Sequence, residues 1–557
     1  MITMQCILRD TFYLYPKAKD EYEVSLYDKC LVYEPCDHSR ARNRTEVRLD
    51  DVIGCHVMKV AEHVTSLKST SSFFCVYAYH LTEKRKGTSQ FREKKTYVFE
   101  VDKEGTYEDN LVISRKWQSA LLWLLRGFRL QKTPDCPIVI PKELPAQRHY
   151  LVIVNPKSGP GKSLEIFLNR VRPILAEADI SHLLLVTERQ NHARDFIRHL
   201  NLTQWSGVLV ISGDGLLFEV YNGLMERPDW KQAVKIPIGI IPGGSGNGLA
   251  RSISHACGEP YVADPILAST LGIVKGRVAP LDLMKIETPK HGPLYSFLTV
   301  GWGLMSDIDI ESERLRAIGE IRFTLWAFWR VFSLRIYNGR ISYLPVTQRK
   351  AASTPQRLTL TRSYTAAKDC LTNGGMETNG KRRKSASSPE PTSLSSTSEF
   401  DEATAIDLEV VTDNHVGRAA KEPALPEVPD SADSFPALTD PVPSDWTVEE
   451  GKFVMIYSSL QSHLGTHLFF APEARPDDGI LWLLIIDANV TRFQLLNYFK
   501  QQEDGNHLSL PYVRMVPVRA FRLESYTDCF MTVDGELVRT PVLQARVLSA
   551  LGRVLTF

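Results

Sequence analysis

The chain has 557 residues, of which 43 % are hydrophobic and 24 % are charged, and its formal net charge is +1. Because a single core stops growing at about 250–300 residues, this length predicts more than one domain. The near-zero charge provides no overall basic field, so the composition indicates no nucleic acid partner and leaves any attraction to anions local.

The nine cysteines are scattered, form no Cys-x-x-Cys pair and are odd in number. This pattern is typical of reduced thiols and indicates a cytoplasmic protein rather than a disulfide-bonded or zinc-binding one. The first residues lack the basic and apolar segments of a secretory signal. The sequence also lacks about 18 consecutive apolar residues, the length that a membrane-spanning helix needs. If the substrate is a lipid, we therefore expect only peripheral membrane association.

Residues 1–145 are predicted to form a separate β-rich module. Short β-rich runs at residues 23–26, 73–79 and 96–100 precede a helical stretch at about 107–128. This order resembles a pleckstrin-homology-like fold. A basic cluster in the module comprises Lys84, Arg85, Lys86, Arg92, Lys94 and Lys95. The cluster either contacts anionic lipid headgroups or is a solvated hairpin.

Residues 146–280 show strands and helices in alternation. Apolar runs at residues 151–154, 183–186, 207–211 and 236–241 alternate with helical segments near 164–177, 192–200, 216–225 and after about 247. This order predicts an α/β nucleotide-binding domain whose parallel sheet is covered by helices on both faces. In such sheets ligands bind beyond the carboxyl ends of the strands, and the loops after all four runs lie there.

After about residue 280 the sequence is β-rich again, which predicts a β-sandwich lipid-binding domain from residues 281–347 and 446–557. The intervening residues 348–445 are rich in Ser, Thr, Pro and Glu and poor in aromatic residues. Such a segment cannot bury enough apolar surface to offset the entropy of ordering, so a disordered insertion is predicted. Its basic run 381–384, beside serines, is either a nuclear-entry or phosphorylation site or, as we favour, a solvated charge run.

The first glycine-rich loop, Asn155-Pro-Lys-Ser-Gly-Pro-Gly-Lys-Ser163, ends like a Walker P-loop. A P-loop needs glycine at the position of Pro156, so that interpretation fails. The loop is instead either a purely structural turn or a glycine turn that lets Asn155 and backbone amides approach a nucleotide.

The loop Ser212-Gly-Asp-Gly215 follows an apolar run and opens a helix, which places the Asp214 carboxylate at the ligand edge of the sheet. A lone Gly-Asp-Gly is usually only a turn. Phosphoryl transfer to an alcohol, however, needs a base or an acceptor that orients the hydroxyl, and Asp214 is the candidate. Glu219 is predicted in the first turn of that helix. It either assists with nucleotide or metal or only complements the helix dipole.

A second glycine loop, Pro242-Gly-Gly-Ser-Gly-Asn247, opens another helix. Glycines let the backbone approach an anion closely, and helix N-termini present unpaired N–H groups and positive partial charge. The loops Ser212–Gly215, with its central Asp214 carboxylate, and Pro242–Asn247 together predict a nucleotide-dependent phosphotransferase.

Longer strings around these loops resemble the sphingosine kinases, which belong to the diacylglycerol-kinase-like lipid kinase superfamily. The strings are Ser212–Gly215, Pro242–Asn247 and residues 187–194, 222–230 and 302–313. The resemblance covers about residues 150–345 and 446–557, and the N-terminal module resembles the extension of the longer animal type. It implies an ATP- and Mg²⁺-dependent kinase that phosphorylates the primary hydroxyl of sphingosine and related sphingoid bases to give sphingosine 1-phosphate.

The resemblance also implies roles for individual residues. Asp214 would be the catalytic base, in a substrate site formed with Ser212, Gly213, Gly215 and Asp309, and Asp309 would meet the amine of the substrate. ATP would contact Asn155, Pro156, Lys157, Thr187, Glu188, Arg189, Gln190, Asn191, Glu219, Gly244, Ser245, Gly246, Arg316, Arg322, Asp534, Gly535 and Glu536. Arg316 and Arg322 would neutralise phosphate charge, and the metal ligands stay unassigned.

The segment 322–337 is aromatic and basic at helical spacing. It matches a part of the family associated with calmodulin, and basic amphipathic helices suit calmodulin or membrane surfaces. Core packing beside a lipid tunnel is the other interpretation, and we favour it.

Two other functions stay open. A ceramide or diacylglycerol kinase would share the glycine loops, but the Asp309 carboxylate and Ser212 before Gly-Asp-Gly favour a cationic sphingoid base. A non-catalytic lipid-binding scaffold would have no need of Asp214, the glycine loops and both arginines.

Overall fold

The computed structural model describes residues 5–16, 20–37, 44–58, 70–83, 90–130, 139–290, 292–318, 321–346, 435–527 and 530–557. The basic runs 84–86 and 381–384 and most of the predicted insertion lie outside these residues. Within the described ranges, every helix is too short or too polar to cross a membrane.

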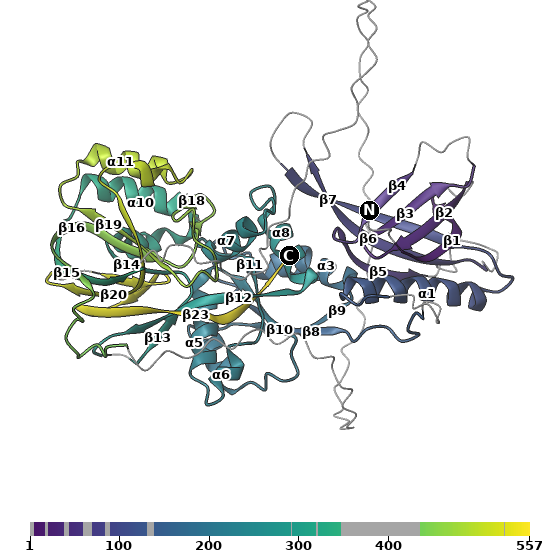
Figure 1. The fold of residues 1–557 in the computed structure, drawn as a ribbon, viewed down its shortest axis with the longest axis horizontal. Helices are drawn as coiled ribbons and strands as arrows, with labels where there is room; N and C mark the ends of the chain where they lie inside the picture. Colours follow the sequence, from purple (N-terminus) through teal and green to yellow (C-terminus); the bar gives the residue numbers. More distant parts are fainter. Residues whose placement is uncertain are drawn as a thin grey trace, which may run out of the picture. The chain divides into compact units, whose positions relative to one another are not determined.

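The N-terminal module is an antiparallel sheet covered by one helix (Figure 1). Its strands, in the order β4-β3-β2-β1-β7-β6-β5, are β1 (Cys6–Tyr15), β2 (Glu21–Tyr27), β3 (Cys30–Pro35), β4 (Thr45–Arg48), β5 (Val52–Met58), β6 (Ser72–Glu83) and β7 (Gln90–Val101). The predicted helix is α1 (Tyr107–Leu125), which begins where the Thr106 hydroxyl accepts a hydrogen bond from an amide of the first turn. α1 packs Trp117 onto Phe74 of β6 with the rings stacked. The predicted β-rich module is therefore present.

Two members of the predicted basic cluster hold this module against the α/β domain. The Arg92 guanidinium donates hydrogen bonds to Glu259 at 2.9 and 2.7 Å and to Asp51 at 2.7 Å. Its side chain is only 4 % exposed. Lys94 pairs with Glu177 at the end of α3 (Arg172–Glu177). The Arg92 side chain is therefore unavailable to a lipid headgroup, which contradicts that interpretation for this residue, whereas the Lys94 side chain is 48 % exposed.

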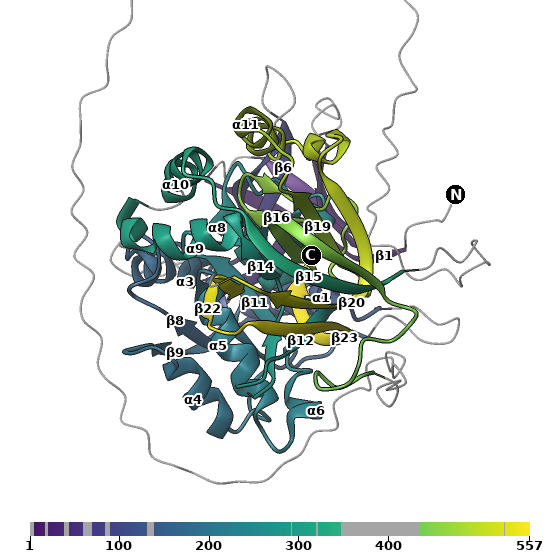
Figure 2. The ribbon, with the colours of Figure 1, turned by 90° about the vertical axis from the view of Figure 1, so that its left-hand side faces the viewer.

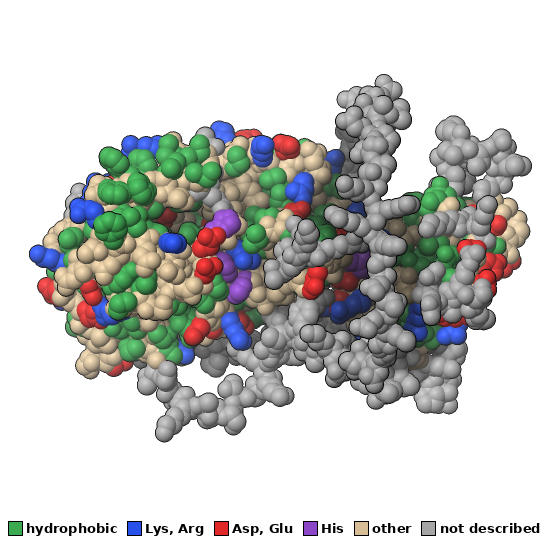
Figure 3. All heavy atoms as spheres, turned by 90° about the horizontal axis from the view of Figure 1, so that it is seen from above, with side chains coloured by type: hydrophobic (Ala, Val, Ile, Leu, Met, Phe, Trp, Pro, Cys, Tyr) green, Lys and Arg blue, Asp and Glu red, His purple; other side chains and the backbone are tan. Residues whose placement is uncertain are grey.

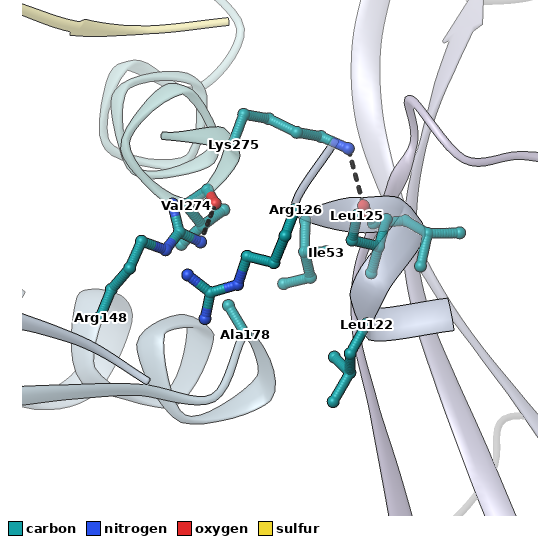
Figure 4. A pocket seen from close by; sticks show the side chains of 9 residues that line it. Ile53, Leu122, Leu125, Arg126, Arg148, Ala178, Val274 and Lys275 are labelled. Carbon is teal, nitrogen blue, oxygen red and sulfur yellow. Dashed lines mark hydrogen bonds between the residues drawn. The ribbon is translucent and has the colours of Figure 1, made fainter. Parts of the chain in front are cut away.

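A small crevice beside this contact is also structural (Figure 4). Lys275 donates hydrogen bonds to the carbonyl oxygens of Leu49 and Val52, at 3.1 and 2.6 Å. Arg148 donates to the carbonyl oxygen of Val274 near the end of α8 (Pro265–Lys275). Because Lys275 and Arg148 already donate hydrogen bonds to backbone carbonyl oxygens, we assign the crevice a structural role.

The α/β domain contains the predicted parallel strands in the order β11-β10-β8-β9. Alternate residues of each strand enter two different cores. Leu151 and Ile153 of β8 join one core, whereas Val152 and Val154 join the other. Burial on both faces explains the continuous apolar runs in the sequence.

The domain's strands are β8 (Arg148–Val154), β9 (Ile180–Val186), β10 (Gly207–Ser212) and β11 (Ile238–Pro242). Its helices are α2 (Ser163–Ile166), η2 (Phe167–Val171), α3 (Arg172–Glu177), α4 (His192–His199), α5 (Asp214–Met225), α6 (Trp230–Ala233), α7 (Gly248–Ala256) and α8 (Pro265–Lys275). Sequence patterns predict all four strands and the helices at α2–α3, α4, α5 and α7.

The β-sandwich domain is antiparallel, as predicted. Its strands are β12 (Arg277–Glu287), β13 (Leu294–Ser296), β14 (Thr299–Gly303), β15 (Tyr337–Pro345), β16 (Thr447–Ser459), β17 (His463–Gly465), β18 (Leu468–Phe469), β19 (Leu481–Asp487), β20 (Arg514–Ser525), β21 (Met531–Val533), β22 (Glu536–Val538) and β23 (Val542–Thr556). Its helices are α9 (Leu304–Glu311), η3 (Ser312–Ile318), α10 (Ile321–Phe332), α11 (Arg492–Gln501) and η5 (Asn506–Ser509). Figures 1 and 2 show α10 and α11 side by side against this domain.

The sandwich strands and the parallel strands are joined through the last strand, β23, which sequence patterns do not predict. β23 pairs antiparallel with β12 and β20, and Val554 near its end pairs in parallel with Ile238 of β11. The sandwich strands other than β17 and β18, which pair only with each other, therefore form one continuous hydrogen-bonded sheet with the parallel strands.

The described end of the predicted insertion, residues 435–445, packs on the sandwich. Arg522 donates hydrogen bonds to the carbonyl oxygens of Ala437 and Asp440, and the Phe435 ring lies 5.9 Å from that of Trp446. These residues belong to the folded domain, which corrects the predicted end of the insertion at residue 445. Composition alone assigns these residues to the insertion, because the groups that Arg522 binds are their backbone carbonyl oxygens, which every residue type has.

Candidate functional site

Four loops meet at one edge of the parallel sheet. β8, β9, β10 and β11 run in the same direction, so the loops that follow them lie together at their carboxyl ends. These loops line one side of a cavity of about 1030 Å³, and residues of the β-sandwich domain line the other side. Single small-molecule sites typically measure about 300–1,000 Å³, so this cavity is large for one ligand.

The structure brings most of the predicted site residues to this cavity. Those that line it are Asn155, Lys157, Thr187, Glu188, Arg189, Gln190, Asn191, Ser212, Gly213, Asp214, Gly215, Glu219, Ser245, Gly246, Asp309, Arg322, Asp534, Gly535 and Glu536. Pro156 and Gly244 belong to the same loops but do not line the cavity. The side chain of Arg316, in η3, lies outside the described part of the structure.

The loops Ser212–Gly215 and Pro242–Asn247 touch backbone to backbone. A Cβ atom on Gly244 would lie 2.4 Å from both the Cα and the N atom of Gly213. Ser158, in the first loop, accepts hydrogen bonds from the Gly213 amide and the Ser212 hydroxyl, both at 3.0 Å. The three loops therefore pack together as one unit. At Gly213 and Gly244 this close backbone contact is possible only because both residues are glycine.

Asp214 is the first residue of α5 and is 8 % exposed. Its carboxylate accepts a hydrogen bond of 3.1 Å from the Gly248 amide at the start of α7. A Cβ atom on Gly246 would lie 3.3 Å from the same oxygen, so glycine leaves room for the carboxylate there. The carboxylate is thus held between two helix N-termini, whose positive partial charge stabilises an anion.

Glu219 fixes a neighbouring loop. Because α5 begins at Asp214, earlier than predicted, Glu219 lies in the second turn of the helix and not in the first. Its carboxylate accepts hydrogen bonds from the amides of Asn191 and Ala193, at 2.9 and 3.2 Å, at the start of α4. Glu219 therefore caps α4 and holds the predicted nucleotide loop 187–191, rather than complementing its own helix dipole.

Two carboxylates of α9 have different partners. Asp307 is buried and accepts hydrogen bonds from Arg330 and the Tyr337 hydroxyl. Asp309, one half-turn further on, lines the cavity. Burial raises the pKa of the Asp309 carboxyl to about 7, against the opposing effect of the Arg322 charge. Asp309 is therefore the α9 carboxylate that a cationic ligand in the cavity can reach.

Asp534 has a structural role that the sequence does not predict. Its carboxylate accepts hydrogen bonds from the Ser296 hydroxyl at 2.6 Å and from the amides of residues 297–299 at 2.8 to 3.2 Å. These bonds close the turn between β13 and β14. Glu536, in contrast, extends its carboxylate toward the start of α5, where it lies 3.1 Å from the position of a Cβ atom on Gly215.

The remaining cavity lining is largely apolar. It comes from the sandwich domain and includes Leu298, Met305, Ile308, Ile321, Phe323, Ala327, Phe328, Leu464, Leu496 and Phe499. A cavity with polar glycine loops on one side and apolar side chains on the other suits an amphiphilic ligand.

No group of three or more His, Cys, Asp and Glu side chains in the described ranges is arranged to hold a metal ion. Mg²⁺ is commonly held by one or two carboxylates together with substrate phosphates. Asp214 is the first residue of α5, and the carboxylate of Glu536, from β22, lies beside this end of the helix. The site therefore suits a metal that arrives with a nucleotide.

Comparisons with known proteins support this architecture. Residues 149–286 match the diacylglycerol kinase catalytic domain, and residues 441–556 match the YegS C-terminal NAD kinase beta sandwich-like domain. The chain is 34 % identical to sphingosine kinase 2 of Homo sapiens, over 99 % of its own length and 91 % of the relative's. The chain belongs to the sphingosine kinase family.

Two further members of the sphingosine kinase family match most of the chain. Sphingosine kinase 1 of Rattus norvegicus is 37 % identical over 74 % of this chain and 91 % of the relative. Sphingosine kinase 1 of Caenorhabditis elegans is 32 % identical over 71 % of this chain and 78 % of the relative. A diacylglycerol-kinase-type catalytic domain implies the use of ATP.

Several residues that line the cavity are not predicted from the sequence. Ser158 lies inside the first glycine loop, so a closer study of that motif could have found it. Thr299 and Tyr457 lie in apolar strands without a motif, and only the pairing of β14 with β16 brings them together. Lys500 of α11 also lines the cavity, and no local signal marks it.

We expect Gly244→Ala to weaken ATP binding and to destabilise the fold by about 1–3 kcal/mol, because the added methyl group would overlap the backbone of Gly213. Calorimetric titration with ATP and thermal unfolding measure the two effects. Gly105→Ala is the matched control, since a Cβ atom there would meet nothing within 4 Å. Unchanged ATP affinity in the Gly244 variant would show that the loop contact does not shape the nucleotide site.

Proposed function

We propose that this protein is an ATP-dependent lipid kinase that phosphorylates the primary hydroxyl of sphingosine and related sphingoid bases to give sphingosine 1-phosphate. The observation that carries the proposal is a single cavity that contains Asp214 among the glycine loops and Asp309 beside the apolar lining. Relatives named sphingosine kinase, similar over most of the chain, support the same substrate class.

The nucleotide would lie over the glycine loops. Backbone N–H groups at the starts of α5 and α7 suit phosphate oxygens, because helix N-termini attract anions. Lys157, Arg189 and Lys500 also line the cavity and add positive charge. Mg²⁺, when bound with the phosphates, would neutralise further charge. The chain's own groups thus hold and orient the phosphates.

Asp214 would act as the base. As the primary hydroxyl oxygen of the lipid forms its bond to the terminal phosphorus, the hydroxyl proton passes to the Asp214 carboxylate and the bond from phosphorus to ADP breaks. The hydrogen bond from the Gly248 amide keeps this carboxylate in place. This role depends on where the Asp214 carboxylate lies, and the packed loops Ser212–Gly215 and Pro242–Asn247 fix that position.

Asp309 would select the lipid class. A sphingoid base carries a primary ammonium next to the reacting carbon, and a carboxylate in a partly apolar cavity binds such a cation well. Ceramide has an uncharged amide at that position and diacylglycerol has an ester, so neither would offer Asp309 a cation. The geometry therefore favours sphingoid bases over ceramide or diacylglycerol.

We expect purified protein to phosphorylate sphingosine with ATP, and Asp214→Asn to lower kcat about 10²–10⁴-fold. Radiolabelled phosphate transfer to sphingosine, ceramide and diacylglycerol measures both claims. Asp229→Asn is the control, since the Asp229 side chain is 58 % exposed and pairs only locally with Arg227. Equal turnover of ceramide would reject the substrate class, and wild-type turnover in the Asp214 variant would reject the base. No turnover of any lipid would favour the scaffold alternative.

We expect kcat/KM for sphingosine to fall as the pH falls through about 7, because the Asp309 pKa is raised to about 7 by burial. Above that pH the group is ionised and binds the ammonium, whereas below it the neutral acid does not. A primary amine stays charged across this range. The pH profile of kcat/KM measures the effect, and Asp309→Asn should remove this acid limb. An unchanged acid limb in that variant would assign it to another group.

α10 presents an apolar face to solvent. Ile321, Leu325, Phe328, Trp329 and Phe332 are each more than half exposed, and Figure 3 shows hydrophobic side chains gathered on the side that carries α10 and α11. The opposite face of α10 is buried, which supports core packing for that face alone. Since α10 also lines the cavity, we infer that its exposed face enters a membrane surface from which the lipid is taken.

Calmodulin would need a different state of this segment. Arg335 is 55 % exposed, but Arg322 and Arg330 are buried, and Arg330 is paired with Asp307. Calmodulin could therefore bind these two arginines only after α10 leaves the domain. The proposed localisation is cytoplasmic with peripheral membrane association. The order of seven strands and one helix in the N-terminal module supports a pleckstrin-homology-like module that assists it. Nuclear entry through residues 381–384 falls outside the described residues.

We expect the double variant Leu325→Ser, Trp329→Ser to reduce binding to anionic phosphatidylcholine–phosphatidylserine vesicles at least about tenfold, with activity on detergent-dispersed sphingosine retained. Vesicle sedimentation measures binding, and Val112→Ser, at a residue that is 66 % exposed on α1, is the control. Undiminished vesicle binding would place membrane contact elsewhere. Calcium-dependent retention of the intact protein on calmodulin would support calmodulin as the partner of α10, and retention of a 322–337 peptide alone would show that the segment is buried.

A further inference from the structure

A phenol lies in the wall of the cavity beside Asp309. Tyr457 of β16 lines the cavity and is 4 % exposed. Its ring rests on Gly301 of the paired strand β14, where a Cβ atom would lie 2.5 Å from the ring. On its other side the ring meets Phe470 edge to face, at 5.7 Å between centroids. The ring is therefore held in one orientation by strand pairing and aromatic packing.

This orientation places the phenol oxygen among polar groups. The Tyr457 hydroxyl lies 3.3 Å from Thr299 Oγ1, to which it donates a hydrogen bond. It also interacts with the Asp309 carboxylate, and this contact lowers the Asp309 pKa against the larger effect of burial. Burial and the nearby Asp309 charge raise the pKa of Tyr457, so the phenol stays neutral. One phenol can donate a single hydrogen bond but can also accept.

Apolar side chains, together with the charged Arg322 and Glu313, complete the lining near Asp309. Met305 and Ile308, from the same helix as Asp309, line the cavity, as does Ala327 of α10. A polar group of a ligand that lies beside Asp309 without a hydrogen bond would cost about 1–3 kcal/mol. Tyr457 and Thr299 are neutral hydroxyl groups in this lining that can satisfy such a ligand group.

We propose that Tyr457 is a specificity-determining residue whose phenol binds the hydroxyl on the carbon next to the amine-bearing carbon of a sphingoid base. The inference rests on the proposed function, in which the first hydroxyl meets Asp214 and the ammonium meets Asp309. The third polar group of the substrate, the 3-hydroxyl, is attached beside the ammonium and must lie near the partner of that ammonium. Thr299 acts as a positioning residue, since it accepts the phenol's hydrogen bond in the free enzyme.

The test compares two substrates that differ only in this hydroxyl. Sphinganine carries the 3-hydroxyl, and 2-amino-1-octadecanol lacks it but keeps the amine and the primary hydroxyl. We expect wild-type kcat/KM to be about tenfold higher for sphinganine, since the site's polar groups lose their partner with the other substrate. In Tyr457→Phe we expect this preference to fall to about onefold, with turnover of 2-amino-1-octadecanol retained.

Tyr343→Phe is the matched control. Tyr343 is also buried in the sandwich domain and donates its hydroxyl to Glu449 at 2.7 Å, but it does not line the cavity. Its variant should keep the wild-type preference, and thermal unfolding of both variants reports on the fold. A preference for sphinganine that persists in Tyr457→Phe, or an equal loss on both substrates, would overturn the proposal.

The outcomes separate this inference from the proposed function. If the wild-type enzyme phosphorylates both substrates equally well, the enzyme is a sphingoid-base kinase and the role of Tyr457 is rejected. If it phosphorylates neither, the proposed function itself is rejected, and the inference with it.

Discussion

The backbone contact between Gly213 and Gly244 is the constraint on which the rest of the site depends. Because the two loops touch, the N-termini of α5 and α7 converge, and the amide of Gly248 can reach the carboxylate of Asp214. Positive helix ends and a carboxylate base are thereby combined at one point. The parallel sheet beneath, buried on both faces, holds these loops rigidly, as catalytic geometry requires.

Carboxylates around the cavity share one chemistry but differ in role because their partners differ. Asp307 is neutralised by Arg330, and Asp534 is surrounded by backbone amides, so both stabilise the fold. Asp214 is fixed at the nucleotide loops, whereas Asp309 faces the cavity with its pKa raised by burial. A buried carboxylate without enough donors resists ionisation and gains most from a cationic ligand. Burial and hydrogen bonding therefore distribute these roles.

Much of the secondary structure could be predicted because it depends on local patterns. Strands of the parallel sheet are continuous apolar runs, since both of their faces are covered. β23 was not predicted, because its apolar residues are interrupted by Arg, Ser and Gly and its pairing with β11 and β12 is remote in sequence. Residues 435–445 were assigned to the insertion on composition, but Arg522 binds their carbonyl oxygens. Neither arrangement has a local signal.

Residue types at short spacing were enough to identify the glycine loops, the candidate base Asp214 and the family. In contrast, only the folded chain shows that Glu219 caps α4, that Asp534 closes a turn and that Tyr457 lies beside Asp309. Those outcomes depend on which strands pair and which side chains become buried. Such long-range contacts are set by the packing of the whole fold, and no short stretch of residues specifies them.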